Sequence, residues 1–366
     1  MESIMFDFIS RIRLGELKEF KNLAIIPLFA ENGPKSPDYL TMEDAINSRL
    51  LIIGEKNSGG SVPELIAQNL AEFPVLLLDG EEVIGAKQNR ILNASILLAP
   101  KSTTVIPVSC VEAHRWNYTT ENFGHSEAYL NYDIRREKHL DVNKSLMESR
   151  EFHADQGKVW ERIDVMNKEL NVKSSTGAMH DAYDLVSDRL KKYFDSFEFI
   201  EGQNGLFAFI DGKIAGFDAL SKTEAFKKVF PKLIKSYAMD AVRADMRNEK
   251  AQARQNVYKA NHSANLNENV ENREVKETIS SGARNKAKVS IEQAKYFMDE
   301  IKGCSENKFK SNGMGYDFRY VGPYAVGSAL IFEDSVIHTA FFKIEKEDIT
   351  GNMSSYKDRM RSRYAR

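Results

Sequence analysis

Short apolar segments separated by turn residues fill the first third of the chain. Each is a few residues long, is rich in β-branched residues, and ends at glycine, proline, asparagine or aspartate. Runs of this kind are typical of β-strands, and their close spacing favours an antiparallel sheet or sandwich. No helical pattern of useful length interrupts residues 48–112, which argues against a parallel β–α–β arrangement there. The expected strands lie at 22–30, 49–55, 61–69, 73–87, 90–99 and 102–112.

The apolar period changes after residue 125. Apolar residues between 155 and 172 recur three or four positions apart, which predicts an amphipathic helix. Residues 175–197 have the same period and predict a second helix. Segment 221–246 is helical as well, and because Pro231 lies inside it we expect a kink or two helices there.

Strands return towards the end of the chain. Asp211-Gly212 stands between two apolar runs and predicts a hairpin over 205–220. A helix is expected at 290–304, followed by three strands within 316–345. The pattern therefore predicts one α+β domain spanning 1–366, in which N- and C-terminal strands form a mainly antiparallel sheet or sandwich and a central helical region packs on it. A division near residue 125 is the alternative.

Two segments do not fit this domain. Residues 251–290 are polar, charged and poor in large apolar side chains, so we expect a mobile or loosely helical insertion. The last residues, 352–366, form a basic tail that we interpret as solvated rather than as a nucleic-acid arm.

Composition narrows the class of protein. The net charge is −2 and the isoelectric point is near 6.4, so nothing favours nucleic acid or a membrane surface as a partner. The apolar runs are too short to cross a bilayer, and a secretory leader pattern is absent. Two cysteines, Cys110 and Cys304, exclude a disulfide framework. We expect a cytoplasmic protein.

The segment 81–90 concentrates polar residues in what is expected to be a half-buried strand. If that strand were unbroken, side chains of one parity would share a face, although Gly85 permits a bulge that resets the parity. A lysine and an arginine close together suit a phosphate or carboxylate, and a neighbouring glutamate could act as a general base. Cross-strand ion pairs on an exposed face are the alternative. The residues are Glu81, Glu82, Lys87, Gln88, Asn89 and Arg90.

A second polar cluster follows at 110–116. Trp116 next to Glu112 and Arg115 would suit a pocket that stacks a base and binds a phosphate. Cys110 and Arg115 have the spacing of an anion-binding cysteine loop, but no glycine stands between them. A plain buried strand cysteine is the favoured interpretation.

The histidines are scattered, and no spacing of histidine and cysteine fits a metal motif. His338 lies in a C-terminal strand and would approach the two clusters if the sheet is shared. The sequence therefore predicts no metal site, and it leaves any cofactor unknown.

The segment VLLLDGEEVIGAKQNRILNASILLAPKSTTVIPVSCVEAHRW resembles the ARPP domain family, whose name records an association with ADP-ribosylglycohydrolases and rhodanese-type phosphatases. The resemblance extends upstream to LGELKEFKNLAIIPLF and downstream to GSALIFEDSVIHTAFF, so it covers nearly the whole chain. It implies a role in ADP-ribose or NAD-derived metabolism, and it marks both polar clusters as motif positions.

Three functions remain open. The leading hypothesis is a hydrolase acting on an ADP-ribose-like phosphorylated nucleotide, with Glu82 or Glu112 as general base, Lys87, Arg90 and Arg115 on phosphate, and Trp116 stacking. A module that binds or sequesters the same ligand without catalysis is the alternative. A structural or partner-binding protein with a buried salt-bridge network is the third.

Overall fold

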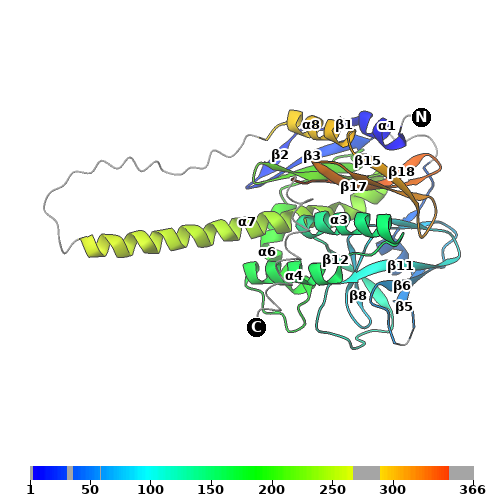
Figure 1. Ribbon diagram of the computed structural model, residues 1–366, viewed down its shortest axis with the longest axis horizontal. Helices are drawn as coiled ribbons and strands as arrows, with labels where there is room; N and C mark the ends of the chain where they lie inside the picture. The colour runs from blue at the N-terminus through cyan, green and yellow to red at the C-terminus, as the bar shows by residue number, and fades with distance from the viewer. Residues whose placement is uncertain (1–2, 31–35, 58, 267–288, 346–366) are drawn as a thin grey trace.

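The computed structural model describes residues 3–30, 36–57, 59–266 and 289–345. Its layers are visible in Figure 1: two short helices cover the upper face of a large sheet, longer helices cover the lower face, and a small barrel lies beneath these helices. The fold is α+β, as expected.

The large sheet joins the two ends of the chain. Strand β3 pairs with β13, and β14 pairs with β18, so the hairpin β13–β14 bridges N-terminal and C-terminal strands. Asp211 and Gly212 make its turn with positive φ, as the sequence predicts. All pairings in this sheet are antiparallel. Its order is β1 (Ile12–Leu14), β3 (Leu23–Ala30), β13 (Gly205–Ile210), β14 (Lys213–Leu220), β18 (Ser335–Lys343), β17 (Ala325–Phe332), β16 (Tyr316–Val321) and β15 (Ser305–Lys310), with β2 (Lys18–Phe20) added on β3.

Each face of the large sheet has its own core. On one face, α1 (Ile4–Ser10) and α8 (Ile291–Ile301) pack on aromatic side chains of the sheet. Helix α8 begins at Ser290, which forms a capping box with Gln293. On the other face, α7 (Thr223–Leu266) and the helices around it bury a second set of apolar side chains.

Six strands between residues 51 and 129 close into a barrel, which the sequence does not predict. Strand β11 pairs with both β6 and β9, so no edge remains. Alternate residues of these strands point inwards and form a separate apolar core. The strands around the barrel are β11 (Ser102–Cys110), β6 (Glu64–Asn69), β5 (Leu51–Glu55), β12 (Phe123–Tyr129), β8 (Glu81–Gly85) and β9 (Arg90–Leu92).

A small three-stranded sheet and one helix adjoin the barrel. The sheet consists of β4 (Leu40–Thr41), β7 (Val75–Leu77) and β10 (Ile96–Leu98). Helix α2 (Met42–Asn47) begins at Thr41, whose hydroxyl accepts a hydrogen bond from the Asp44 amide at 3.2 Å. Met42 and Ala45 of α2 belong to the barrel core, which fixes the helix against that structure.

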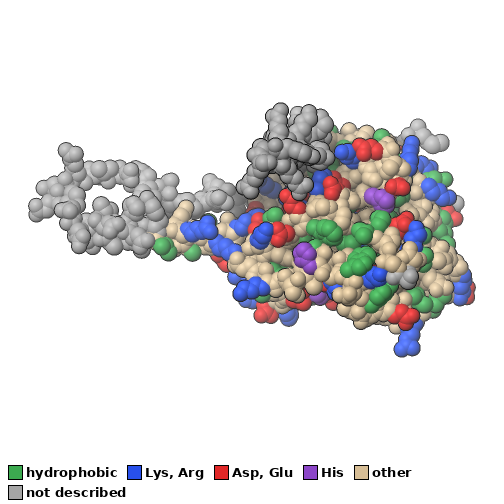
Figure 2. Space-filling model, turned by 60° about the horizontal axis from the view of Figure 1, so that its bottom comes forward, with side chains coloured by type: hydrophobic (Ala, Val, Ile, Leu, Met, Phe, Trp, Pro, Cys, Tyr) green, Lys and Arg blue, Asp and Glu red, His purple; other side chains and the backbone are tan. Residues whose placement is uncertain are grey.

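Helix α3 (Tyr132–Glu148) was not predicted from the sequence, whereas α4 (Gln156–Leu170) was. The single helix expected over 175–197 is divided at Val186 into α5 (Met179–Leu185) and α6 (Ser187–Phe194). Helix α7 is not divided at Pro231. It continues through 251–266 and extends from the body in Figure 1 and in Figure 2. Residues 267–288 of the expected insertion, and 352–366, lie outside the described residues.

Candidate binding site at the barrel mouth

The segment 81–90 is a hairpin rather than one unbroken strand. Strand β8 ends at Gly85, where φ is +116°, and β9 begins at Arg90. Glu82 lies opposite Ile91, and Val83 lies opposite Arg90. The parity expected for an unbroken strand is therefore wrong, because the turn changes the face on which the second half of the segment points.

Three polar side chains occupy inward positions of the barrel near its end. Arg90 and Cys110 are directly paired, and both have the inward parity of the core residues Leu92 and Val108. Glu55 follows the inward residue Ile53 on β5 by two positions, so it shares that parity as well. A guanidinium, a thiol and a carboxylate thus meet where apolar side chains fill the rest of the interior.

The Arg90 guanidinium is only partly satisfied by the protein. Its NH1 donates to the backbone and side-chain oxygens of Gln88, both at 3.1 Å. Its Nε and NH2 have no hydrogen-bond partner among the described residues, and neither has Oε2 of Glu55. Burial lowers the pKa of Arg90, because the charged form is poorly solvated there. Unsatisfied buried donors and acceptors are costly, which makes this the most unusual point of the barrel.

Aromatic side chains and a lysine cover the Arg90 guanidinium. Arg90 lies 5.6 Å from the centre of the Trp116 ring, and the Lys87 ammonium lies 5.4 Å from the same ring. Lys87 also lies 5.2 Å from the centre of the Tyr118 ring and donates to the carbonyl of Gly59 at 2.7 Å. Trp116 and Tyr118 are 42% and 51% exposed, so the cover is itself open to solvent.

An open cleft of about 650 Å³ adjoins this cover. Glu55 and Tyr118 belong both to the cleft and to the group around Arg90. The cleft is large enough for a nucleotide-sized molecule. Its lining consists of Gly54, Glu55, Asn57, Tyr118, Thr119, Thr120, Glu121 and Asn122.

Glu112 and Arg115 instead bind each other and the hairpin turn. Their charged atoms are 2.7 Å apart, and Arg115 also donates to the carbonyl of Ala86 at 2.7 Å and to Asn89 Oδ1 at 3.0 Å. Burial alone would raise the pKa of Glu112. The hydrogen bonds from Arg115 and from the Asn89 amide outweigh this effect and lower the pKa. Gln88 donates to the Glu112 carbonyl at 2.7 Å. These contacts tie the turn 85–89 to the loop that carries Trp116.

Cys110 has the character of a core residue. Burial raises the pKa of its thiol to about 11 despite the nearby Arg90. Gln156 accepts from its amide at 2.7 Å and donates to its carbonyl at 2.8 Å. No helix begins directly after Cys110, so its backbone does not form the cradle of an anion-binding cysteine loop.

Glu81 and Glu82 lie away from this mouth. Glu82 is 1% exposed, and its Oε2 accepts from Ser126 Oγ at 2.6 Å and from His180 Nδ1 at 3.2 Å. The hydrogen bond with Glu82 raises the pKa of His180 to about 8. Glu81 is equally buried and accepts from the Leu78 amide at 2.8 Å. The structure therefore brings together most of the predicted residues, but not these two.

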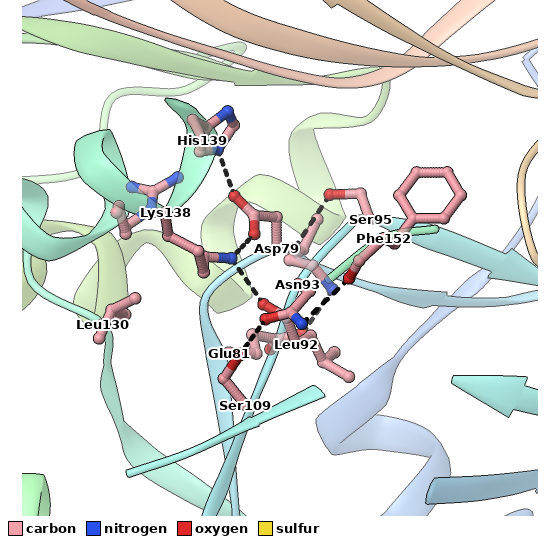
Figure 3. A network of polar contacts seen from close by, with 12 residues as sticks. Asp79, Glu81, Leu92, Asn93, Ser95, Ser109, Leu130, Lys138, His139 and Phe152 are labelled. Carbon is pink, nitrogen blue, oxygen red and sulfur yellow. Dashed lines mark hydrogen bonds and ion pairs between the residues drawn. The ribbon is translucent and has the colours of Figure 1, made fainter. Parts of the chain in front are cut away.

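A second polar network, between the barrel and the helices, was missed by sequence reasoning. Figure 3 shows Asp79 receiving hydrogen bonds from Lys138 and His139, neighbours on α3. Lys138 also donates to the Leu92 carbonyl at 2.7 Å, and the Asp79 amide donates to Ser95 Oγ at 3.0 Å. Burial lowers the pKa of both Lys138 and His139.

The network continues into the large sheet. Ser95 Oγ lies 2.7 Å from His338 Nδ1, and His338 Nε2 lies 3.6 Å from Asp218, which also receives two hydrogen bonds from Arg135. Ser95, His338 and Asp218 are at most 4% exposed, so Ser95 is not available to a substrate. This network joins barrel, helix and sheet. His338 therefore belongs to it and not to the barrel mouth. No local sequence pattern predicts this network. Its members come from segments that are far apart in the sequence, and each segment has the pattern of an ordinary strand or helix.

The site and fold together define an α+β protein with a small barrel whose mouth holds partly unsatisfied polar groups. Residues 11–283 and 273–342 match the family described as ARG and Rhodanese-Phosphatase-superfamily-associated Protein domain. The chain belongs to this family, as its sequence indicates. No curated protein and no solved structure matches it. Within the part of the chain that is described, no helix is both long and apolar enough to cross a membrane.

Proposed function

We propose that this protein binds a small phosphorylated nucleotide of the ADP-ribose class at the barrel mouth. One observation carries the proposal: Arg90 offers two buried nitrogen donors, and Glu55 one buried carboxylate oxygen, for which the described residues supply no partner. A ligand that both accepts and donates hydrogen bonds would satisfy the two together. A ribose phosphate has this combination in its phosphate oxygens and hydroxyl groups.

The surrounding side chains fit the rest of such a ligand. Phosphate oxygens match the planar donor fork of arginine, with the charge of Lys87 close by. A ribose hydroxyl would donate to Glu55. Trp116 and Tyr118 offer exposed aromatic faces on which a base can stack. Because Trp116 lies over Arg90, the ligand reaches the guanidinium only when the indole ring moves aside.

Isothermal titration calorimetry with ADP-ribose, AMP and NAD tests the proposal. We expect saturable binding of at least one of them, and about tenfold weaker binding by Tyr118→Ala, since one aromatic–base stack contributes ~1–3 kcal/mol. Tyr296→Ala is the matched control, because Tyr296 is 66% exposed on α8 and outside the cleft. Absence of binding heat with all three compounds would contradict the proposal. An equal loss of affinity in Tyr118→Ala and Tyr296→Ala would contradict it as well.

Hydrolysis of a phosphorylated nucleotide is the second candidate, and it rests on the Glu82–His180 pair, which lies away from the barrel mouth and would contact its substrate separately. The His180 side chain is 30% exposed, whereas the Glu82 side chain is fully buried, so the imidazole is the member that can meet a substrate. With a pKa near 8, His180 is mostly protonated at neutral pH and suits a general acid, oriented by Glu82.

Turnover of the bound compound, followed by product chromatography, separates an enzyme from a binding module. His180→Gln should abolish turnover and leave the affinity for the ligand unchanged if the pair is catalytic. Binding without turnover in the wild-type protein would favour the sequestering module instead. The purely structural alternative draws on the internal Glu112–Arg115 pairing, and it predicts neither binding nor turnover.

A further inference from the structure

A group of three potential metal ligands lies beside helix α2. Glu43 comes from α2, and His125 and Glu127 come from β12. One ligand atom of each lies within 4.8 Å of the others. Ligand atoms around one Zn²⁺ are about 3–4 Å apart, since the bonds to nitrogen and oxygen are about 2.0–2.2 Å long. The side chain of Glu127 is 64% exposed, so a rotation of this side chain can close the remaining gap.

The ring of His125 is held in the orientation of a metal ligand. Its Nε2 lies 3.1 Å from Oδ1 of Asn47, at the end of α2. An imidazole that donates Nε2–H to an amide oxygen keeps a lone pair on Nδ1. That Nδ1 is buried and has no hydrogen-bond partner among the described residues. A metal-binding histidine usually donates the hydrogen of one ring nitrogen to an oxygen acceptor, which leaves the other ring nitrogen for the metal.

A buried carboxylate on the neighbouring strand points to a cation independently. Glu81 is 1% exposed, and its Oε1 has no partner within the described part of the chain. On β8 it shares a face with Val83, which lies directly opposite His125. Glu81 therefore points to the side on which His125 lies. Burial raises the pKa of Glu81, and the charge of Lys232 opposes this shift.

Two lysines accompany these carboxylates. Lys232 lies 2.8 Å from Glu43, and Lys235 lies 3.4 Å from Glu127. The second pair is exposed and weak, so a cation can displace Lys235 from Glu127 at little cost.

We propose that Glu43, His125 and Glu127 form a binding site for one divalent transition-metal ion of the Zn²⁺ class, on the side of the barrel strands to which Glu81 points. One nitrogen and two carboxylate oxygens suit this class of ion better than Ca²⁺ or Mg²⁺, which prefer oxygen ligands alone. The sequence does not indicate the site, because its residues follow no metal motif. The proposal shares no residue with the barrel mouth and stands whether or not a nucleotide binds there.

Calorimetric titration of the chelator-treated full chain with ZnCl₂ tests the proposal. We expect one tight site in the wild-type protein and at least about tenfold weaker binding in His125→Ala and in Glu127→Gln. His153→Ala is the matched control, because His153 also pairs with a glutamate, Glu151, but lies elsewhere. Titration with Co²⁺ gives a second readout, since its visible absorption should change in His125→Ala and not in His153→Ala.

Three results would overturn the site: no tight Zn²⁺ binding by the wild-type protein, equal binding by the wild-type protein and both site variants, or an equal loss in the His153→Ala control. Glu127→Gln decides the matter if His125→Ala fails to fold. The exposed position of Glu127 makes its substitution harmless to the core.

Discussion

Arg90 and Arg135 are both fully buried, but the surroundings of their guanidinium groups differ. Arg135 forms two hydrogen bonds with Asp218, and this carboxylate raises the pKa of Arg135 although burial opposes the charge. Among the described residues, no carboxylate is in hydrogen-bond contact with Arg90, and burial lowers its pKa. One nitrogen of Arg135 and two of Arg90 have no partner in that part of the chain. Because only Arg135 has a counter-charge, we assign it to the fold and Arg90 to a ligand.

Replacement of each arginine by methionine should separate these roles. Arg135→Met leaves Asp218 buried without its counter-charge and should lower the free energy of unfolding by about 3–5 kcal/mol. Arg90→Met removes unsatisfied donors and should change it by less than about 1 kcal/mol, or stabilise the protein. Urea unfolding of both variants measures the difference. Equal destabilisation would show that Arg90 is a structural residue like Arg135.

The two cysteines should be unreactive in the folded protein. Burial raises the pKa of both Cys110 and Cys304 to about 11. Relative to an ordinary thiol, the thiolate fraction at pH 8 falls by about a hundredfold. We expect slow labelling by a thiol reagent in buffer and rapid labelling of both residues in urea. Fast modification of Cys110 in the native state would contradict the assignment of this residue to the core.

Local patterns along the sequence predict single elements well. The hairpin β13–β14 and the helices α4 and α8 follow from turn residues and apolar period. The hairpin at 81–90 was predicted less well, because its turn has no Asn-Gly or Asp-Gly pair. Gly85 alone is compatible both with a continuous strand and with a turn.

Gly85 is required by the geometry of this hairpin. Its φ is +116°, and a Cβ built on it would lie 2.2 Å from Oγ1 of Thr120. We expect Gly85→Ala to reduce the free energy of unfolding by ~1–3 kcal/mol and to weaken ligand binding, since the loop that carries Tyr118 must shift. Thermal unfolding and calorimetry measure both effects. Gly124→Ala is the control, because a Cβ there has nothing within 4 Å; a matching loss in this variant would contradict the argument.

At the scale of the whole molecule, the sequence predicts the fold class but not the closure of the barrel. The shared sheet follows from strands at both ends of the chain. Barrel closure depends on the pairing of β9 with β11 and of β8 with β12, and sequence alternation alone does not choose between such partners. Lys87, Arg90 and Trp116 were found because they stand in two short polar segments, whereas Glu55 and Tyr118 of the same mouth were missed. The Asp79–Asp218 network was missed because long-range contacts assemble it.

This network should make stability depend on pH. Burial and the neighbouring cations lower the pKa of His139, whereas the unfolded chain binds a proton at this residue near pH 6.5. The unfolded state then holds more protons below that pH, so the free energy of unfolding falls as the pH decreases from 7 to 5. Relative to His139→Gln, the wild-type protein should lose up to about 1.4 kcal/mol per pH unit. If the free energy of unfolding changed with pH equally in the wild-type protein and in His139→Gln, His139 would not be neutral in the folded state.

Hydrogen–deuterium exchange with and without saturating ADP-ribose is the most direct test of the barrel-mouth site. A ligand that contacts Glu55, Arg90 and the Trp116 loop should slow exchange in 55–60, 86–90 and 112–122, and leave the large sheet unchanged. Unchanged exchange throughout the chain, or protection confined to segments outside the barrel, would contradict the account.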